Sequence, residues 1–571
     1  MGHRNKTTLA ILLLGTAGSA YAQAGNSGNV NLADNSEVLQ AWQSASGGEM
    51  PELAQDPEGG TRIEWHGGIT LDKYETNATG GNTLTPLRQG NFYKAQVQGD
   101  VRGTNQEGEV SYAQFSATNT DDRAALSHAT QINSLQFGRM GKGYQVALGD
   151  VAASFSALGA SLGLRGILAQ KQFGQTTLAG TAGVIAESWE SLVRSVPRTK
   201  LVRDVAAAKL ETPVSASTRV FGTVQGYSDE KGSLATGISA LAPAAASSAT
   251  VGFAMQQERF SLQGEAGGSH WSEEGQLGHN DNAVVLDASW GFDKGFLSAG
   301  HHKIGKYYGS LGGGAGVGVK ETYLNGNWNA ASWITLGADA RHSQNDMAGT
   351  PPPVTIPPTP PSTPNAAKTD SLATNASINF GPSLPGWNLL LNQMLSKGWN
   401  ADNSTNRNSS YGANLVYAGQ EWNSGLGYTR SRLTNNAAAA SNSQTTGWTF
   451  NLGKLLTDAS ATWTASANFL AAHQEQKLDA GGSTRSTNWN LGLTGQRSGW
   501  GSLTASYQAG VTSQTVGGPD LRQKGYLVDA THPFQGTNAS IKLYLRSNHT
   551  YGAPGLGYNE KTAGLQLVYQ L

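Results

Sequence analysis

The last nine residues of the chain alternate between apolar and polar side chains. The apolar positions are Leu571, Tyr569, Leu567, Leu565 and Ala563, and three of the four residues between them are Gly or Gln. A period of two is typical of a β-strand with one apolar and one polar face. In water, the apolar face of such a terminal strand would promote aggregation. In a membrane-spanning barrel, the same face would contact lipid and the polar face would line a hydrated lumen.

This ending resembles the C-terminal strand of bacterial outer-membrane β-barrels, which carries an aromatic residue third from the end. Tyr569 holds that position, and Leu571 stands where the family usually has Phe or Trp. The resemblance implies that Leu567, Tyr569 and Leu571 form the signal read by the barrel-assembly machinery, and that outer-membrane lipid surrounds the folded protein. The alternative is an ordinary amphipathic edge strand, since alternation also occurs in soluble antiparallel sheets.

The first residues have the pattern of a secretory signal peptide. Basic residues within the first six precede an apolar run over residues 9–14, and small residues follow up to Ala20 and Ala22. This is the arrangement of an n-region, an h-region and an A-x-A cleavage site. The apolar run is too short to anchor the chain as a spanning helix. We therefore predict a signal peptide over residues 1–22, a mature chain that starts at Gln23, and export to the outer membrane of a Gram-negative bacterium.

The composition fits a barrel better than a soluble protein. Hydrophobic residues make up 38% of the chain, below the roughly 45–50% usual for soluble domains. Barrel strands need only one apolar residue in two. The chain has no Cys, so its stability must come from packing and strand pairing without disulfides. A net charge of −1 gives no indication of a nucleic-acid partner.

The connections between predicted strands alternate in length when they are counted back from the C-terminus. Outer-membrane barrels have short turns on the periplasmic side and longer loops outside, whereas a soluble sandwich has no reason to keep this rhythm. The long connections are 547–558, 511–524, 471–484, 435–446 and 397–409, and the short ones are 532–538, 496–501, 455–460, 418–421 and 381–386.

The next connection back, residues 346–369, is rich in Pro. Pro-rich segments favour a stiff, extended polyproline II conformation. Its place in the rhythm predicts an external loop, and a linker between two domains is the alternative. Residues 23–60 are mostly polar and predict a short periplasmic segment, a plug inside the lumen, or a flexible tail. Between residues 188 and 246, the pattern does not assign the connections to sides.

The fold predicted from these patterns is all-β: a single large antiparallel transmembrane β-barrel over residues 61–571. At about 20 residues for each strand and its connection, the region holds roughly 24 strands, within a range of about 22–26. Bacterial barrels of one chain have even strand numbers from 8 to 26 and beyond. A barrel of this width has a lumen that must be plugged or gated.

The motifs that could carry chemistry do not meet the requirements of catalysis. Ser161 stands in a G-x-S-x-G sequence but leads into a strand rather than the helix of a nucleophile elbow. His301 and His302 are adjacent on a predicted strand, so they point to opposite faces and cannot share a metal. The Gly-rich run 312–318 lacks the Lys-Ser/Thr of a phosphate loop. We predict no catalytic residue, no metal site and no cofactor.

A short pair of strands carries a second resemblance. Gly149-Asp150, Phe155 and Arg165-Gly166 resemble a G-D…F…R-G strand pair of fimbrial ushers, the outer-membrane barrels that export pilus subunits. The likeness covers about 20 residues. It implies a role in export and periplasmic export partners.

Four basic residues lie close together in the segment 189–204. Rings of Arg and Lys select anions in pores, so an inward-folded loop here would form a positive constriction. A solvated connection is the alternative. The candidate constriction consists of Arg194, Arg198, Lys200 and Arg203.

The function predicted from the sequence is passage: a porin-like channel for export or uptake, with no chemistry of its own. One alternative is a barrel that anchors an adhesin or serves as an assembly platform at the cell surface. An outer-membrane hydrolase is a further alternative, for which the sequence offers no constellation of catalytic residues.

Overall fold

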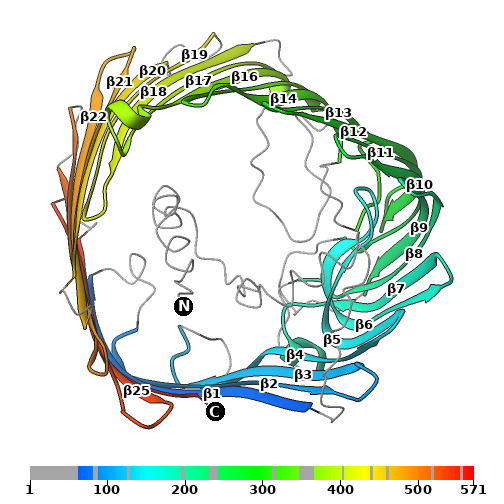
Figure 1. The fold of residues 1–571 in the computed structure, drawn as a ribbon, viewed down its shortest axis with the longest axis horizontal. Coiled ribbons are helices and arrows are strands. Elements are labelled where there is room, and N and C mark those ends of the chain that lie inside the picture. Colours follow the sequence, from blue (N-terminus) through cyan, green and yellow to red (C-terminus); the bar gives the residue numbers. More distant parts are fainter. Residues whose placement is uncertain are drawn as a thin grey trace, which may run out of the picture. The chain divides into compact units, whose positions relative to one another are not determined.

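The computed structural model describes most of the chain after residue 61. The described residues form strands that each pair antiparallel with the next, and the last strand pairs with the first. The sheet therefore closes on itself as a barrel of 26 strands, seen along its axis in Figure 1. The described residues are 62–80, 88–124, 126, 129–193, 200–230, 242–311, 317–345, 366–400, 404–436, 442–457, 462–515, 520–552 and 557–570.

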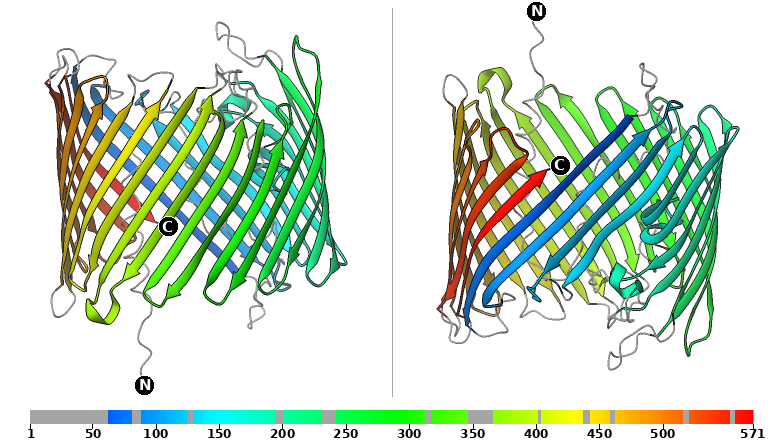
Figure 2. Two further views of the ribbon diagram at one scale, coloured as in Figure 1. Left: turned by 90° about the horizontal axis from the view of Figure 1, so that it is seen from above. Right: turned by 90° about the horizontal axis from the view of Figure 1, so that it is seen from below.

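The strands follow one another around the barrel in chain order, and Figure 2 shows their common tilt. Two short helical segments, α2 (Trp189–Val193) and η2 (Gly381–Ser383), lie in connections. The strands are β1 Arg62–Gly80, β2 Gly90–Thr104, β3 Val110–Thr120, β4 Thr130–Gly141, β5 Tyr144–Ser154, β6 Ser161–Phe173, β7 Thr176–Ile185, β8 Arg203–Ser215, β9 Thr218–Asp229, β10 Ala244–Gln256, β11 Phe260–Glu273, β12 His279–Phe292, β13 Gly295–Ile304, β14 Val319–Ala331, β15 Ile334–Asn345, β16 Ala366–Asn379, β17 Trp387–Asn400, β18 Thr405–Ala418, β19 Trp422–Asn435, β20 Ser443–Thr457, β21 Trp463–Leu478, β22 Ser483–Arg497, β23 Gly501–Gln514, β24 Leu521–Pro533, β25 Ala539–Tyr551 and β26 Tyr558–Gln570.

The predicted fold class is confirmed, and the strand number stands at the upper end of the predicted range. Between residues 188 and 246, where the sequence pattern did not assign the connections to sides, the structure has the strands β8 and β9. The predicted signal peptide over 1–22 and the polar lead over 23–60 lie outside the described residues. Among the residues that the structure describes, no helix has the length and apolar character needed to cross a bilayer.

The outer face of the barrel is an apolar belt. Residues directly opposite each other on neighbouring strands share a face, so the register can be followed around the whole ring. Leu543 lies opposite Leu565, and Leu567 lies opposite Leu71 across the closing seam. All four are exposed, as expected for side chains that contact lipid. Tyr569 shares this outward face, and Leu571 lies outside the described residues.

Aromatic residues on the outer face border the belt at both ends of strands β17–β26, as interfacial girdles do in membrane barrels. Tyr428 and Trp448 stand opposite each other with ring centroids 4.5 Å apart. The girdle at the end with the longer connections contains Tyr411, Tyr428, Trp448, Trp489, Tyr507 and Tyr526, and the other contains Trp387, Tyr417, Trp422, Trp463 and Tyr569.

The two ends of the barrel differ in their connections. One end, which holds the C-terminus of β26, has tight turns such as 174–175 and 293–294. The opposite end has the longest connections, which are 186–202, 230–243, 305–318 and 346–365. Between β16 and β26, where the sequence predicted the rhythm, it is only partly present: the connections 479–482 and 401–404 at the long-connection end are shorter than 458–462 and 380–386 at the other end. The general rule for these barrels puts the end with the longest connections outside the cell.

The sequence overestimated the length of several long connections in the C-terminal half. β21 continues to Leu478, so only residues 479–482 connect it to β22, where the pattern predicted a connection over 471–484. β16 likewise begins at Ala366, inside the predicted Pro-rich loop 346–369. The reason is that backbone pairing continues beyond the lipid belt, where side chains no longer need to be apolar.

A tyrosine on the lumen side spans the closing seam of the barrel. Tyr544 of β25 lies over Gly564 of β26, where an added Cβ would be 2.3 Å from the Tyr544 ring. Its hydroxyl donates to Asp72 of β1 at 2.9 Å. On the same face, Lys542 pairs with Asp529 at 2.8 Å, in agreement with the inward direction that strand alternation predicts for Lys542. Tyr544 thus joins three strands, two of which lie at opposite ends of the sequence.

Replacing Tyr544 by Phe should destabilise the closed barrel. The variant loses a buried hydrogen bond to a carboxylate, a contribution of about 1.5–3 kcal/mol. The temperature at which the folded, fast-migrating form disappears from a gel should fall. Tyr507→Phe, on the lipid face, is the matched control and should behave like the parent. Equal transitions for Tyr544→Phe and the parent would show that the seam does not depend on this bond.

The Pro-rich connection allows a direct test of orientation. Thr359 lies outside the described residues, between the ends of β15 and β16 at the long-connection end. A protease site inserted at Thr359 should be cut in intact cells, because long connections of such barrels face outward. Cleavage only after the outer membrane is opened would mean that the barrel has the inverse orientation.

Candidate functional site

A hairpin formed by β5 and β6 leaves the wall and lies inside the barrel (Figure 1). β4 pairs with β5 only up to Gln136 and Gly149, and β6 pairs with β7 only from Arg165 onward. Between these points residues 150–154 pair with 161–165 across the hairpin, and residues 155–160 form its tip. The wall of the barrel therefore opens here, and the tip of the hairpin is free to cross the lumen side of later strands.

A row of glycines forms the hinge. Gly149, Gly166 and Gly183 stand side by side in register on β5, β6 and β7. A Cβ atom would lie 2.1 Å from the Leu135 carbonyl oxygen at Gly149 and 2.3 Å from the Arg165 carbonyl oxygen at Gly183. Gly149 also has φ +102°, a conformation that favours glycine. Only glycine lets the three backbones approach closely enough for the hairpin to bend inward.

Side chains replace the strand pairing that β4 loses. The Leu135 amide donates to Asp150 at 2.7 Å, and the Ile132 amide donates to Glu190 at 2.6 Å. The Trp189 indole also donates to Asp150, at 2.8 Å. Glu190 and Trp189 belong to α2, which packs against β4. Backbone groups that would otherwise be unpaired in the wall are thus satisfied.

Arg165 completes the hinge by donating to the Ala186 carbonyl at 2.6 Å and lying 3.4 Å from Asp150. The residues that resembled a usher strand pair, Gly149-Asp150 and Arg165-Gly166, are therefore the hinge of the hairpin.

The tip of the hairpin is held to the inner side of the neighbouring wall by Glu265 of β11. Its carboxylate accepts hydrogen bonds from the Ser156 hydroxyl at 2.7 Å and from the Leu158 amide at 3.0 Å. Thr250 of β10 donates to the same carboxylate at 2.5 Å. Glu265 is only 5% exposed, and a buried carboxylate with this many donors is well stabilised. Gln225 of β9 adds a bond to the Leu158 carbonyl at 3.0 Å.

Apolar packing supports these hydrogen bonds. Leu158, 1% exposed, packs in a cluster with Ala283, Val285, Ile304 and Tyr308 from β12, β13 and the connection after β13. Burial and the negative charge of Glu265 raise the pKa of Tyr308 to about 12, so its hydroxyl is neutral at physiological pH. The hairpin is therefore docked over β9–β13 rather than suspended in the lumen.

A second part of the lumen, lined by β16–β23, carries no charge on the inward face of its described strands. The face is defined by the register, since Leu391, Ala413 and Tyr428 share the outer side. The inward residues are Ser, Thr, Asn, Gln, Gly and a few apolar residues. All charged residues of these eight strands are outward, and they are Lys368, Asp370, Lys397, Arg407, Arg430, Arg432, Lys454, Glu475, Lys477, Arg485 and Arg497.

On this inner face, asparagine side chains lie across glycines of the neighbouring strand. The side chain of Asn392 lies across Gly412 of the next strand, and that of Asn451 lies across Gly425. In both places an added Cβ would lie 2.1–2.2 Å from the amide oxygen. Glycine opposite asparagine lets the amide lie flat along the wall. The result is a smooth surface of neutral hydrogen-bond donors and acceptors.

Of the predicted basic constriction, only Lys200 and Arg203 lie within the described part of the chain. Arg203 is 5% exposed and forms a two-point ion pair with Asp229, with distances of 2.7 and 2.9 Å. Its guanidinium also lies 3.9 Å from the Tyr227 ring centroid, so its charge is already compensated. Lys200 is exposed, whereas Arg194 and Arg198 lie outside the described residues.

The other sequence motifs occupy ordinary positions. Ser161 begins β6, and its backbone amide donates to the Leu311 carbonyl at 3.0 Å. His302 faces inward and contacts Asp287 at 2.7 Å, while His301 on the opposite face contacts Thr322 at 2.8 Å. Within the described part of the chain, no group of three His, Cys, Asp or Glu residues could hold a metal ion.

Sequence reasoning missed both the inward hairpin and the uncharged inner face. The first was detectable only as a local G-D and R-G pair. The second could have been found by asking whether the charged residues of each strand stand at odd or even positions. Successive residues of a strand point to opposite faces, and the charged residues of β16–β23 all share the face of the apolar residues.

Several solved structures are similar to this chain over most of its length. The chain is similar to the siderophore receptor PirA of Pseudomonas aeruginosa, with 10% identity, coverage of 89% of this chain and 80% of that one, and a TM-score of 0.37. It is similar to the translocation pore of the P pilus usher PapC, with 12% identity, coverage of 89% of this chain and 99% of that one, and a TM-score of 0.34. It is also similar to the copper transporter OprC, with 9% identity, coverage of 90% of this chain and 81% of that one, and a TM-score of 0.40. No protein-family model and no curated protein matches the sequence.

The closed sheet, its apolar belt and its two aromatic girdles define an outer-membrane β-barrel of the Gram-negative type. Within it, two parts of the described lumen are unlike: β9–β13 are covered by a docked hairpin, and β16–β23 form an uncharged amide and hydroxyl surface.

The docking of the hairpin can be tested by thiol labelling, because the chain has no cysteine of its own. The substitution Leu158→Cys should give a thiol that reacts slowly with a maleimide, since that position is buried. Adding Glu265→Ala removes the acceptor of two bonds from the tip and should speed the reaction severalfold. Ala152→Cys, exposed on the same hairpin, is the control and should react rapidly with or without Glu265→Ala. Equally slow labelling of Leu158→Cys in both backgrounds would show that apolar packing alone holds the tip.

Proposed function

We propose that the protein is an outer-membrane channel for bulky, uncharged, polar cargo, which passes between the docked hairpin and the wall formed by β16–β23. The observation that carries this proposal is the absence of charge on the inward face of the described residues of those eight strands. Outer-membrane lumens are polar, and rings of charge are the usual means by which pores select ions. A polar wall without charge provides passage but no ionic selection.

The amide and hydroxyl surface suits a cargo rich in hydroxyl or amide groups. Each neutral hydrogen bond contributes little net free energy in water, about 0.5–1.5 kcal/mol. A cargo that exchanges such bonds along the wall binds weakly at many sites, and conduction requires weak binding at several sites. Fixed charges would instead hold an oppositely charged segment or repel a like one.

The hairpin accounts for how so wide a barrel can be kept from leaking. Barrels of 16–18 strands already leave an aqueous channel, and wider ones are plugged. With 26 strands, this barrel needs an internal obstruction. The hairpin is part of that obstruction, and residues 23–60 are a further candidate, as a plug or a periplasmic segment. The barrel-assembly machinery and export partners in the periplasm remain proposed partners.

Two alternative proposals predict different ion conduction through the lumen. The basic segment with Arg194, Arg198 and Lys200 would make the channel prefer anions, without a contribution from the paired Arg203. A barrel that only anchors an adhesin or an assembly platform would conduct no ions. Measurements in planar bilayers distinguish these proposals from a channel with an uncharged wall.

The experiment compares the parent with two variants in planar bilayers. Replacing residues 151–163 by a tight turn should raise the single-channel conductance severalfold, because the obstruction is removed. In that wide variant, the further changes Asn392→Asp, Asn451→Asp and Asn468→Asp should shift the reversal potential towards cations, and the shift should fade as salt screens the new charges. Neutral dextrans should reduce the current more than polyanions of the same size.

The matched control places three new carboxylates on the outer face at the rim, by Gln444→Asp, Thr487→Asp and Ser513→Asp. This variant should keep the parent's selectivity. If the three inward substitutions also leave selectivity unchanged, the wall formed by β16–β23 is not part of the conducting path. If neither the parent nor the shortened variant conducts, the anchor proposal is favoured.

A further inference from the structure

The charges that are missing from the lumen of β16–β23 are gathered on the outside of the barrel. They lie mainly beyond the aromatic girdle at the long-connection end. On β17 and β18, Lys397 lies opposite Arg407, and on β19 the next outward position beyond Arg430 is Arg432. At the other end of the same wall, the outward basic residues are Lys454 and Arg497. The basic side chains are therefore concentrated near one leaflet.

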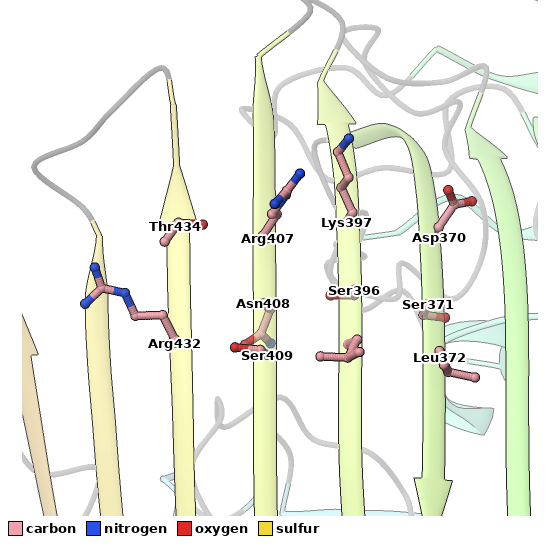
Figure 3. A pocket seen from close by; sticks show the side chains of 11 residues that line it. Asp370, Ser371, Leu372, Ser396, Lys397, Arg407, Asn408, Ser409, Arg432 and Thr434 are labelled. Carbon is pink, nitrogen blue, oxygen red and sulfur yellow. The ribbon is translucent and has the colours of Figure 1, made fainter.

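Part of this rim forms a groove, shown in Figure 3. The groove has a volume of about 540 Å³ and is lined by residues of β16–β19. Lys397, Arg407 and Arg432 border it, and Leu372 and Leu395 are its apolar residues. The two leucines stand opposite each other on the outer face, where the lipid belt ends. The groove thus has an apolar part facing the acyl chains and a basic part above it.

The charge balance leaves the groove positive. Its one acidic residue, Asp370, is hydrogen-bonded to His342 and is outnumbered by the cations that border the groove. Arg432 is held in place by Asp479, with two hydrogen bonds of 2.9 and 2.6 Å. Lys397 lies 4.4 Å from the Trp399 ring centroid, which orients its ammonium group. Arg407 is exposed and presents its guanidinium at the centre of the groove.

We propose that this groove binds a phosphorylated amphiphile of the external leaflet, with its phosphate held by Lys397 and Arg407 beside the Arg432–Asp479 pair and its acyl chain against Leu372 and Leu395. Guanidinium groups recognise phosphate through paired hydrogen bonds, and an ammonium adds a point charge. Basic residues at a membrane surface attract anionic headgroups. The apolar residues directly below the charges select a lipid over a free anion. The proposal does not depend on what the lumen conducts.

Neighbouring rim charges support the choice of this groove over the rest of the rim. On β21 and β22, Glu475 already pairs with Arg485 at 2.8 Å and with Lys477 at 3.3 Å. Those cations are compensated by a carboxylate, whereas Lys397 and Arg407 face the groove and form no ion pair with a carboxylate of the described residues. A phosphate in the groove would supply the missing negative charge.

The test uses the purified full-length barrel in neutral detergent and measures lipid binding by native mass spectrometry. The probe is a hexa-acylated glucosamine disaccharide with two phosphates, and its dephosphorylated form is the comparison. The parent should bind the phosphorylated probe at least tenfold more tightly. Lys397→Gln with Arg407→Gln should remove most of this preference, and adding Arg432→Gln should remove the rest. The double variant leaves the Arg432–Asp479 pair intact, so it guards against a folding defect.

Lys454→Gln with Arg497→Gln is the matched control, because it removes two outward cations at the other end of the same wall. It should bind like the parent. Equal binding of the phosphorylated and dephosphorylated probes, or unchanged binding by the double variant, would overturn the proposal. Displacement of the probe by millimolar inorganic phosphate would also overturn it, because the groove would then be a site for free anions.

Discussion

The structure depends on one requirement: every backbone N–H and C=O group in the lipid belt must have a partner within the protein. A sheet meets this requirement only by closing, so β26 must find β1. The closing strands are joined by more than their ladder, since Tyr544 reaches across Gly564 to Asp72. The same requirement explains the hinge of the hairpin. Where β5 turns away from β4, Asp150 and Glu190 take over the amides of Leu135 and Ile132.

Strand alternation then divides the chemistry of the barrel between its faces. In most membrane barrels the outward face is apolar and the lumen carries the charge. On β16–β23 the outward face carries both: leucines and aromatic residues within the belt, and cations such as Arg407 and Arg432 beyond it. The inward face keeps only neutral polar groups such as Asn392 and Asn451. The two-residue alternation of these strands thus separates an outer face, with a lipid-contacting belt and a basic rim, from an uncharged inner wall.

Much of this could be predicted from the sequence because it depends on local periodicity. The alternation from Ala563 to Tyr569 predicted an outward apolar face, and the sequence of connections predicted an antiparallel barrel. The hairpin could not be predicted in the same way. Its position depends on Glu265, which is more than 100 residues from the Leu158 amide that it binds, and alternation along a strand carries no information on such contacts. The pairing of Arg203 with Asp229 was missed for the same reason: the basic segment was visible, but its partner on β9 was not.

The hairpin also resolves an apparent conflict between two parts of the lumen. Unlike β16–β23, strands β8–β11 carry inward charges, among them Arg203 and Glu265. Arg203 is compensated by Asp229, and Glu265 is covered by the hairpin tip. The positions of the hairpin that remain exposed are uncharged, and they are Ala152, Ser154, Ala157, Ser161 and Gly163. By docking where it does, the hairpin lays an uncharged surface over part of a charged wall, so that cargo would meet small neutral groups on one side and amides on the other. This gives the docked position a reason beyond narrowing the barrel.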